Sequence, residues 1–206
     1  MMLGSFAFWL SLHRYVGKPT WKFYQLKDTL RAIGVLLLPQ IAIQVYTSLD
    51  KPILALFKSS REVAFYDNSQ RISTMILGVI TAITIVMMPK MAITKKSAQQ
   101  IFLKKTYETS LALGLLFAAI IMVNTKEFVP FFFGEKFVPM TPLMFASTLT
   151  IILIPVGSVF ANQFALANKR DRDFAVPVII GAIISLLLGL LLDPIFGAAG
   201  AMLTVI

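Results

Sequence analysis

The chain has 206 residues, of which 57% are hydrophobic and 14% are charged, and its formal net charge is +9. Because a soluble domain has about 25% charged residues, the composition excludes a soluble globular protein and requires apolar residues to face lipid. With no cysteine and a single histidine, disulfide scaffolds, cysteine nucleophiles and multi-histidine metal sites are excluded too.

Five stretches are long and apolar enough for transmembrane helices, which need about 20 mostly apolar residues. Continuous runs such as LLLGLLL fit helices and do not fit the period-two alternation of β-barrel strands. In chain order, the expected spans are residues 32–57, 65–92, 106–125, 140–167 and 175–192. The sequence therefore predicts an all-α, polytopic transmembrane helix bundle that forms one lobe over residues 1–206.

Both ends of the chain carry incomplete apolar stretches. Residues 1–12 are too short to span a membrane, and their charges follow the apolar run, which is not typical of a cleaved signal peptide. Residues 196–206 stop inside another apolar run. We therefore expect partial spans at 1–12 and 196–206, in a chain that is a fragment of a longer protein.

The loops predict the orientation of the bundle. Thirteen of the nineteen Lys and Arg residues lie in or beside the loops 14–31, 90–105 and 167–174, and the other six lie on the alternate side. Because basic loops stay in the cytoplasm, these three loops are predicted to be cytoplasmic in a multi-pass protein of the cell membrane. Membrane topology accounts for the positive charge, so the bilayer and not nucleic acid is the expected partner. Binding of anionic lipid by the same basic loops is an alternative interpretation.

Polar residues inside the spans are the candidate site, because a charged group at a helix centre costs about 2.5 to 3.5 kcal/mol. These residues lie on one face of each span: Gln40, Gln44, Thr47 and Lys51 in the first, Arg71, Thr74, Gly78 and Thr81 in the second, and Thr148, Pro155, Ser158 and Asn162 in the fourth. Helical spacing places each set on one side of its helix. The three faces could line one hydrated cavity, or their hydroxyl and amide groups could bond across helix contacts.

Arg71 is the leading candidate for substrate contact, because a basic side chain facing lipid at that depth would be costly. The alternatives are an ion pair with Asp50, expected at similar depth, or snorkelling to the interface. Asp50 is the only carboxylate expected at a deep position. The predicted cavity residues are Arg71, Lys51, Asp50, Gln40, Gln44 and Asn162, and no catalytic residue, metal or cofactor is predicted.

Several stretches resemble the polysaccharide-transport (oligosaccharide flippase) family of the multidrug/oligosaccharidyl-lipid/polysaccharide (MOP) exporter superfamily. They are LLPQIAIQVYTSLDKPILALFKSSREVAFYDNSQRI (37–72), FFGEKFVPMTPLM (132–144), ANQFALANKRDRDF (161–174) and LLLDPIFGAAGAMLTVI (190–206). The resemblance implies the C-terminal six-helix lobe of a two-lobe transporter, with a missing N-terminal lobe completing a central cavity. It implies that an undecaprenyl-diphosphate-linked oligosaccharide is flipped for cell-surface polysaccharide biosynthesis.

The same resemblance bears on Arg71. Related lipid II flippases carry a cavity-lining arginine in a similar YADRL stretch, which supports a substrate role for Arg71. Those proteins carry an acidic residue three positions after the arginine, whereas this chain has Thr74 there. An ion-pair mechanism that uses this acidic residue therefore does not carry over.

Three other functions stay open at this stage. One is a MATE-like antiporter of a drug or metabolite cation, which would be expected to bury an acid as its ion site. Another is a membrane-bound glycosyl- or phosphotransferase, for which the only close acidic pair is Asp171 and Asp173. The third is a non-transporting truncated remnant. The sequence favours the flippase and predicts no enzyme activity.

Overall fold

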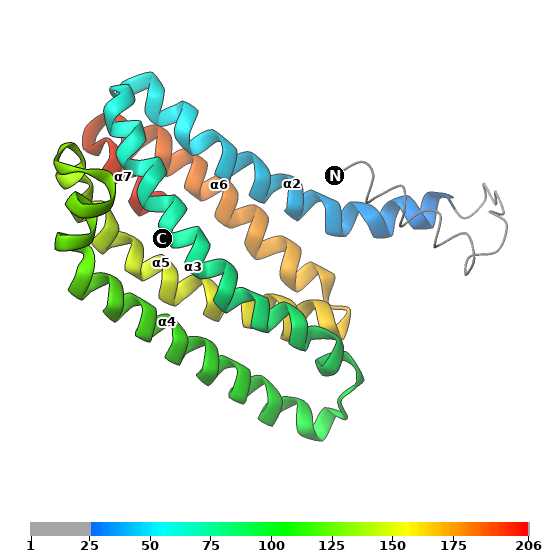
Figure 1. The fold of residues 1–206 in the computed structure, drawn as a ribbon. Helices are drawn as coiled ribbons and strands as arrows, with labels where there is room; N and C mark the ends of the chain where they lie inside the picture. Colours follow the sequence, from blue (N-terminus) through cyan, green and yellow to red (C-terminus); the bar gives the residue numbers. More distant parts are fainter. Residues whose placement is uncertain (1–25, 206) are drawn as a thin grey trace, which may run out of the picture. The chain divides into compact units, whose positions relative to one another are not determined.

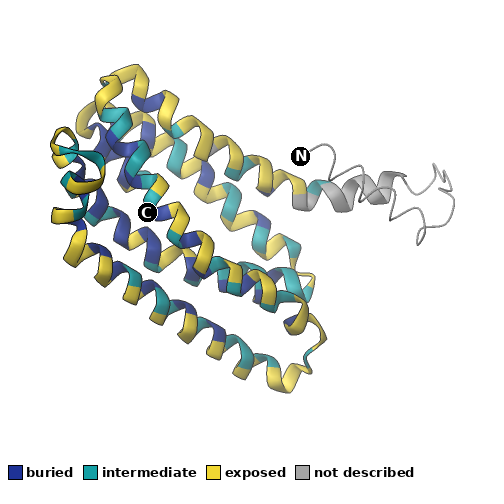
Figure 2. Ribbon diagram, viewed as in Figure 1, coloured by how far each residue is buried: buried dark blue, intermediate teal, exposed yellow. Residues whose placement is uncertain are grey.

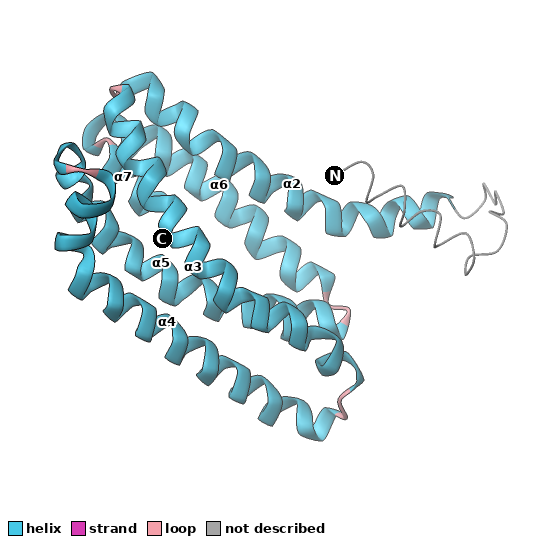
Figure 3. Cartoon of the chain, viewed as in Figure 1, coloured by secondary structure: helices cyan, strands magenta, loops and turns pink. Residues whose placement is uncertain are grey.

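The computed structural model describes the backbone of residues 26–205, and the side chains from residue 34 on except those of 35, 36 and 46. Every regular element in this part of the chain is helical (Figure 3). The predicted all-α fold is confirmed. The long helices are α2 (Leu26–Phe57), α3 (Ser60–Ile93), α4 (Lys96–Phe133), α5 (Thr141–Val159) and α6 (Asp171–Phe196), followed by the short α7 (Ala198–Val205).

Two compact units divide the chain, residues 1–34 and 35–206, and each is considered by itself. In the first unit, only the start of α2 is described. The predicted partial span 1–12 and the loop 14–31 up to residue 25 lie outside the described residues. That residues 1–206 form a single lobe stays a prediction, and all contacts below belong to the second unit.

Four helical stretches of the described chain are long and apolar enough to cross a membrane. They are Ser60–Ile93, Lys96–Phe133, Glu135–Asn168 and Asp171–Phe196. Each contains one of the last four predicted spans. The first predicted span, 32–57, lies within α2, where several side chains are not described.

Helices α3, α4 and α5 pack against one another, and α6 packs on α7 (Figure 1). The buried face of α4 begins with four small residues spaced by four: Thr106, Ser110, Gly114 and Ala118. A Cβ on Gly114 would lie 3.0 Å from the main-chain oxygen of Ile151 on α5. Such a seam of small residues brings helix backbones close together, as is common in membrane bundles.

Exposed residues lie along every long helix (Figure 2), and many of them are large and apolar. Val123 on α4 is 79% exposed and Phe131 is 89% exposed. So many exposed large apolar side chains are unusual on a soluble monomer and are expected where helices face lipid.

The turns of the second unit gather at two ends. At one, the η2 end, the turn between α2 and α3 meets the 3-10 helix η2 (Glu135–Met140), where Arg61 Nη2 donates to the main-chain oxygen of Lys136 at 3.2 Å. Gly197 also lies there, with a φ of +59° that favours glycine. At the other, the basic end, the α3–α4 and α5–α6 turns line a common pocket. The cytoplasmic orientation of the basic end stays a prediction.

Candidate functional site

Three charged residues meet on α2 and α3. Lys51 Nζ forms an ion pair with Asp67 Oδ1, and Arg71 Nε lies 3.0 Å from Asp67 Oδ2. Asp67 and Arg71 are four residues apart on α3, the spacing at which helix side chains are neighbours. We call Lys51, Asp67 and Arg71 the charged triad; it carries two positive charges against one negative charge.

The two basic side chains of the triad are exposed on the surface of the unit. The side chains of Lys51 and Arg71 are 46% and 66% exposed. Arg71 follows Ser60, the first residue of α3, by eleven positions, which at 1.5 Å per residue is about 17 Å along the helix. The predicted span 65–92 begins six residues before Arg71, about 9 Å along the helix at the same rise, so Arg71 lies inside the expected membrane segment.

The polar face of α2 continues from the triad. Gln40, Gln44 and Thr47 are exposed like Lys51, and Thr47 Oγ1 donates back to the Ile43 carbonyl at 2.8 Å. On α3, Thr74 and Gly78 are exposed beyond Arg71. The two predicted polar faces therefore meet at the Lys51–Asp67 pair, and neither is covered by the described part of the unit.

Asp50 does not pair with Arg71, so that alternative interpretation was wrong. Its Oδ2 accepts a hydrogen bond from the Tyr66 hydroxyl at 3.2 Å, whereas Arg71 pairs with Asp67. Tyr66 is 1% exposed, and its hydroxyl oxygen also accepts a hydrogen bond from Gln70 Nε2 at 3.5 Å. Adjacent residues on α2 point about 100° apart, which is why Asp50 and Lys51 reach different partners on α3.

A buried carboxylate lies near the half-buried Asp50. Asp193 on α6 is 1% exposed, and its Oδ1 has no hydrogen-bond partner among the described residues. It lies close enough to the Asp50 carboxylate for the two negative charges to repel each other. We call Asp50, Tyr66 and Asp193 the acidic cluster. That Asp50 is the only carboxylate at a deep position in the membrane stays a prediction, but Asp193 is more buried within the unit than Asp50 is.

Asn162 is not brought together with Arg71. It lies in a π-helical turn, η3 (Phe160–Ala165), where its amide donates to Ser158 Oγ at 2.9 Å and to Thr84 Oγ1 at 3.4 Å. Thr84 follows Arg71 by thirteen positions, about 20 Å along α3. The polar face of the fourth span therefore bonds across the α3–α5 contact and does not join the open faces of α2 and α3 there.

Sequence reasoning missed Asp67 and Asp193 as site residues. For Asp67 the signal was available, because an acid four residues before a base on a helix predicts a pair. Nothing in the local sequence marks Asp193, since its closeness to Asp50 arises only when α6 returns to the η2 end.

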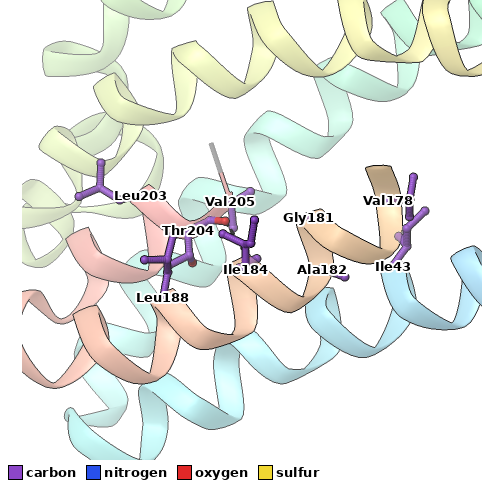
Figure 4. A pocket seen from close by; sticks show the side chains of 10 residues that line it. Ile43, Val178, Gly181, Ala182, Ile184, Leu188, Leu203, Thr204 and Val205 are labelled. Atoms are coloured by element: carbon purple, nitrogen blue, oxygen red, sulfur yellow. Dashed lines mark hydrogen bonds between the residues drawn. The ribbon is translucent and has the colours of Figure 1, made fainter. Parts of the chain in front are cut away.

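An apolar groove of about 430 Å³ lies beside the polar face of α2, between α2, α6 and α7 (Figure 4). Ile43, Val178 and Ile184 are among its lining residues, and Ser185 Oγ donates to the Thr204 carbonyl at 2.9 Å. None of the predicted site residues lines this groove. Its lining suits an alkyl chain better than a sugar, because it offers few hydrogen-bonding groups.

Comparison with known proteins finds a family whose model covers the charged triad. A family model described as "Polysaccharide biosynthesis protein" matches residues 2–142. The match includes Lys51, Asp67 and Arg71, whereas Asn162 and Asp193 lie beyond it. No curated protein and no solved structure matches the chain.

Proposed function

Because the chain belongs to the polysaccharide biosynthesis protein family and is a multi-pass membrane protein, we propose that it flips a lipid-linked oligosaccharide. In this proposal it is the C-terminal lobe of a MOP-superfamily transporter in the cell membrane, with its basic end in the cytoplasm. It is a transporter and not an enzyme.

The observation that carries the proposal is the exposed charged triad on the long helices α2 and α3. Lys51 and Arg71 would be costly in contact with lipid, so their open face requires an aqueous or protein surrounding. The triad's excess positive charge suits the diphosphate of a lipid-linked sugar. Arg71 would bind it through the guanidinium nitrogens that Asp67 leaves free, because a guanidinium forms bidentate pairs with phosphate.

The exposed polar face of α2 suits the rest of the substrate. Gln40, Gln44 and Thr47 offer amide and hydroxyl groups that can hydrogen-bond sugar hydroxyls. A second lobe facing α2 and α3 would enclose these groups in a hydrated cavity, and rocking of the two lobes would expose it to one leaflet and then the other. The lipid tail would remain in the bilayer.

Replacing Arg71 tests the proposal. In cells whose surface polysaccharide depends on this protein, Arg71→Ala should lower export at least tenfold, and lipid-linked repeat units should accumulate. Arg71→Lys should keep part of the activity, because lysine preserves the positive charge but cannot form the bidentate hydrogen bonds of a guanidinium. Arg172→Ala, which removes an exposed arginine from the first turn of α6, is the matched control. Unchanged export in the Arg71→Ala variant contradicts the proposal.

A MATE-like cation antiporter is the second candidate, because the buried Asp193 and the half-buried Asp50 supply the acids that such an ion site needs. It predicts proton- or sodium-driven efflux of a cationic dye that Asp193→Asn abolishes. Under the flippase proposal, dye efflux is absent. A protein that moves neither dye nor lipid-linked sugar would be a non-transporting remnant.

A further inference from the structure

A pocket of about 540 Å³ lies at the basic end, where the α3–α4 and α5–α6 turns meet. Its polar lining consists of two cations, Lys96 and Arg170, and three amides, Gln99, Gln100 and Asn168. No carboxylate is among its lining residues. The lining therefore offers hydrogen-bond donors and positive charge, which is the chemistry of an anion site.

Two helices begin at this pocket. Lys96 is the first residue of α4 and Arg170 directly precedes α6, and neither start is capped by a side-chain hydrogen bond. The partial positive charge of a helix start adds to the field of the two cations. Asp171 and Asp173 in the first turn of α6 oppose this field, so the side chains of the pocket are the main attraction.

Contacts with neighbouring side chains hold Arg170 in place and leave part of its guanidinium group available for a ligand. Its guanidinium stacks over the Phe164 ring, 4.5 Å from the ring centroid, and its Nε pairs with Asp173 Oδ2 at 2.5 Å. Its two terminal nitrogens form no hydrogen bond to the described residues. Asn168 is anchored too, because its amide donates to the Phe164 carbonyl at 3.0 Å. Such supported side chains are preorganised for a ligand.

The remaining lining is apolar and comes from Met91, Leu103 and Phe164. Beside it on the helices, Ile93 is 85% and Ile101 is 71% exposed. A free anion would gain nothing from this surface, whereas the acyl chains of a lipid would bury it. The ligand that fits both halves of the lining is amphipathic and anionic.

We propose that this pocket binds an anionic phospholipid, with its phosphate on Lys96 and Arg170 and its chains along α3 and α4. Basic pockets between helices at the membrane surface are suited to such headgroups. The site is separate from the charged triad and does not depend on the proposed transport. Bound lipid would fasten the α3–α4 turn to the α5–α6 turn.

The experiment measures lipid retention by the whole chain. The protein, purified in detergent and given equal amounts of phosphatidylglycerol and phosphatidylcholine, is analysed by native mass spectrometry. Phosphatidylglycerol should be retained at least tenfold more. Separately, Lys96→Gln and Arg170→Gln should each weaken its binding about tenfold, the loss expected for one charge-assisted contact. Lys104→Gln and Arg172→Gln remove exposed cations outside the pocket and should leave the binding unchanged.

Competition separates the sources of phosphate. Glycerol 3-phosphate at a hundredfold excess should not displace the lipid, because it lacks the chains; displacement would overturn the amphipathic site. Preferential retention of a polyprenyl diphosphate over phosphatidylglycerol would overturn the phospholipid assignment. Equal retention of phosphatidylglycerol and phosphatidylcholine, or equal losses in the control variants, would overturn the pocket.

Discussion

Lys51 of α2 forms an ion pair with Asp67 of α3. The pair joins two helices at the point where their polar faces meet, and it leaves Arg71 sharing the same carboxylate. A single acid therefore holds two bases in a hydrophobic helix pair. This arrangement places positive charge on the open face without isolating any charged group in lipid.

The first prediction concerns the strength of the Lys51–Asp67 pair. A double-mutant cycle with Lys51→Gln and Asp67→Asn should give a coupling energy of about 0.5–1 kcal/mol in denaturant unfolding, as for a half-exposed pair. The cycle with Lys104→Gln and Glu108→Gln, whose atoms are 3.8 Å apart on exposed side chains, should give less. A coupling energy of zero for Lys51 and Asp67 would show that the two residues do not join α2 to α3.

The second prediction concerns the seam between α4 and α5. Gly114→Ala should lower the free energy of unfolding by about 1–3 kcal/mol, because the added methyl meets the backbone of Ile151 and Ile152. Gly157→Ala, with no atom near its Cβ position, should be neutral or stabilising, since alanine favours helix. Equal effects of the two substitutions would contradict the close approach of the helices.

The third prediction concerns Asp193. Asp193→Asn should raise the free energy of unfolding at pH 8 by about 1 kcal/mol, because it removes a buried negative charge beside Asp50. Glu108→Gln, on an exposed side chain, should change it by less than about 0.5 kcal/mol. Clear destabilisation by Asp193→Asn would indicate that the carboxylate has a cationic partner.

The fourth prediction separates packing from transport at Asn162. Asn162→Ala should lower the free energy of unfolding by about 0.6–1.7 kcal/mol, the range for hydrogen bonds between membrane helices. Asn124→Ala is the control, because the amide of Asn124 bonds only within α4 among the described residues. Export should persist in both variants. Loss of export in Asn162→Ala with unchanged stability would return Asn162 to the substrate site.

The sequence predicted the helices well, because continuous apolar runs and the polar turns between them depend only on local composition. It also predicted the open polar face of α2, since the spacing from Gln40 to Lys51 fixes one side of a helix. The partners of these residues depend on helix rotation and on contacts between distant segments. For this reason Asp50 was matched with the wrong base, Asn162 was grouped with residues about 20 Å away, and Asp193 was overlooked.

The most direct test asks whether water reaches the open polar face. The chain has no cysteine, so single cysteines can be introduced at Thr74, on that face, and at Ala119, an exposed position of α4 about 21 Å from the same end of the bundle by helix rise. In intact cells carrying the complete transporter, a membrane-impermeant maleimide should label Thr74→Cys at least tenfold faster than Ala119→Cys. If Thr74→Cys is as unreactive as Ala119→Cys, the polar face lies against lipid or packed protein, and the hydrated cavity is contradicted.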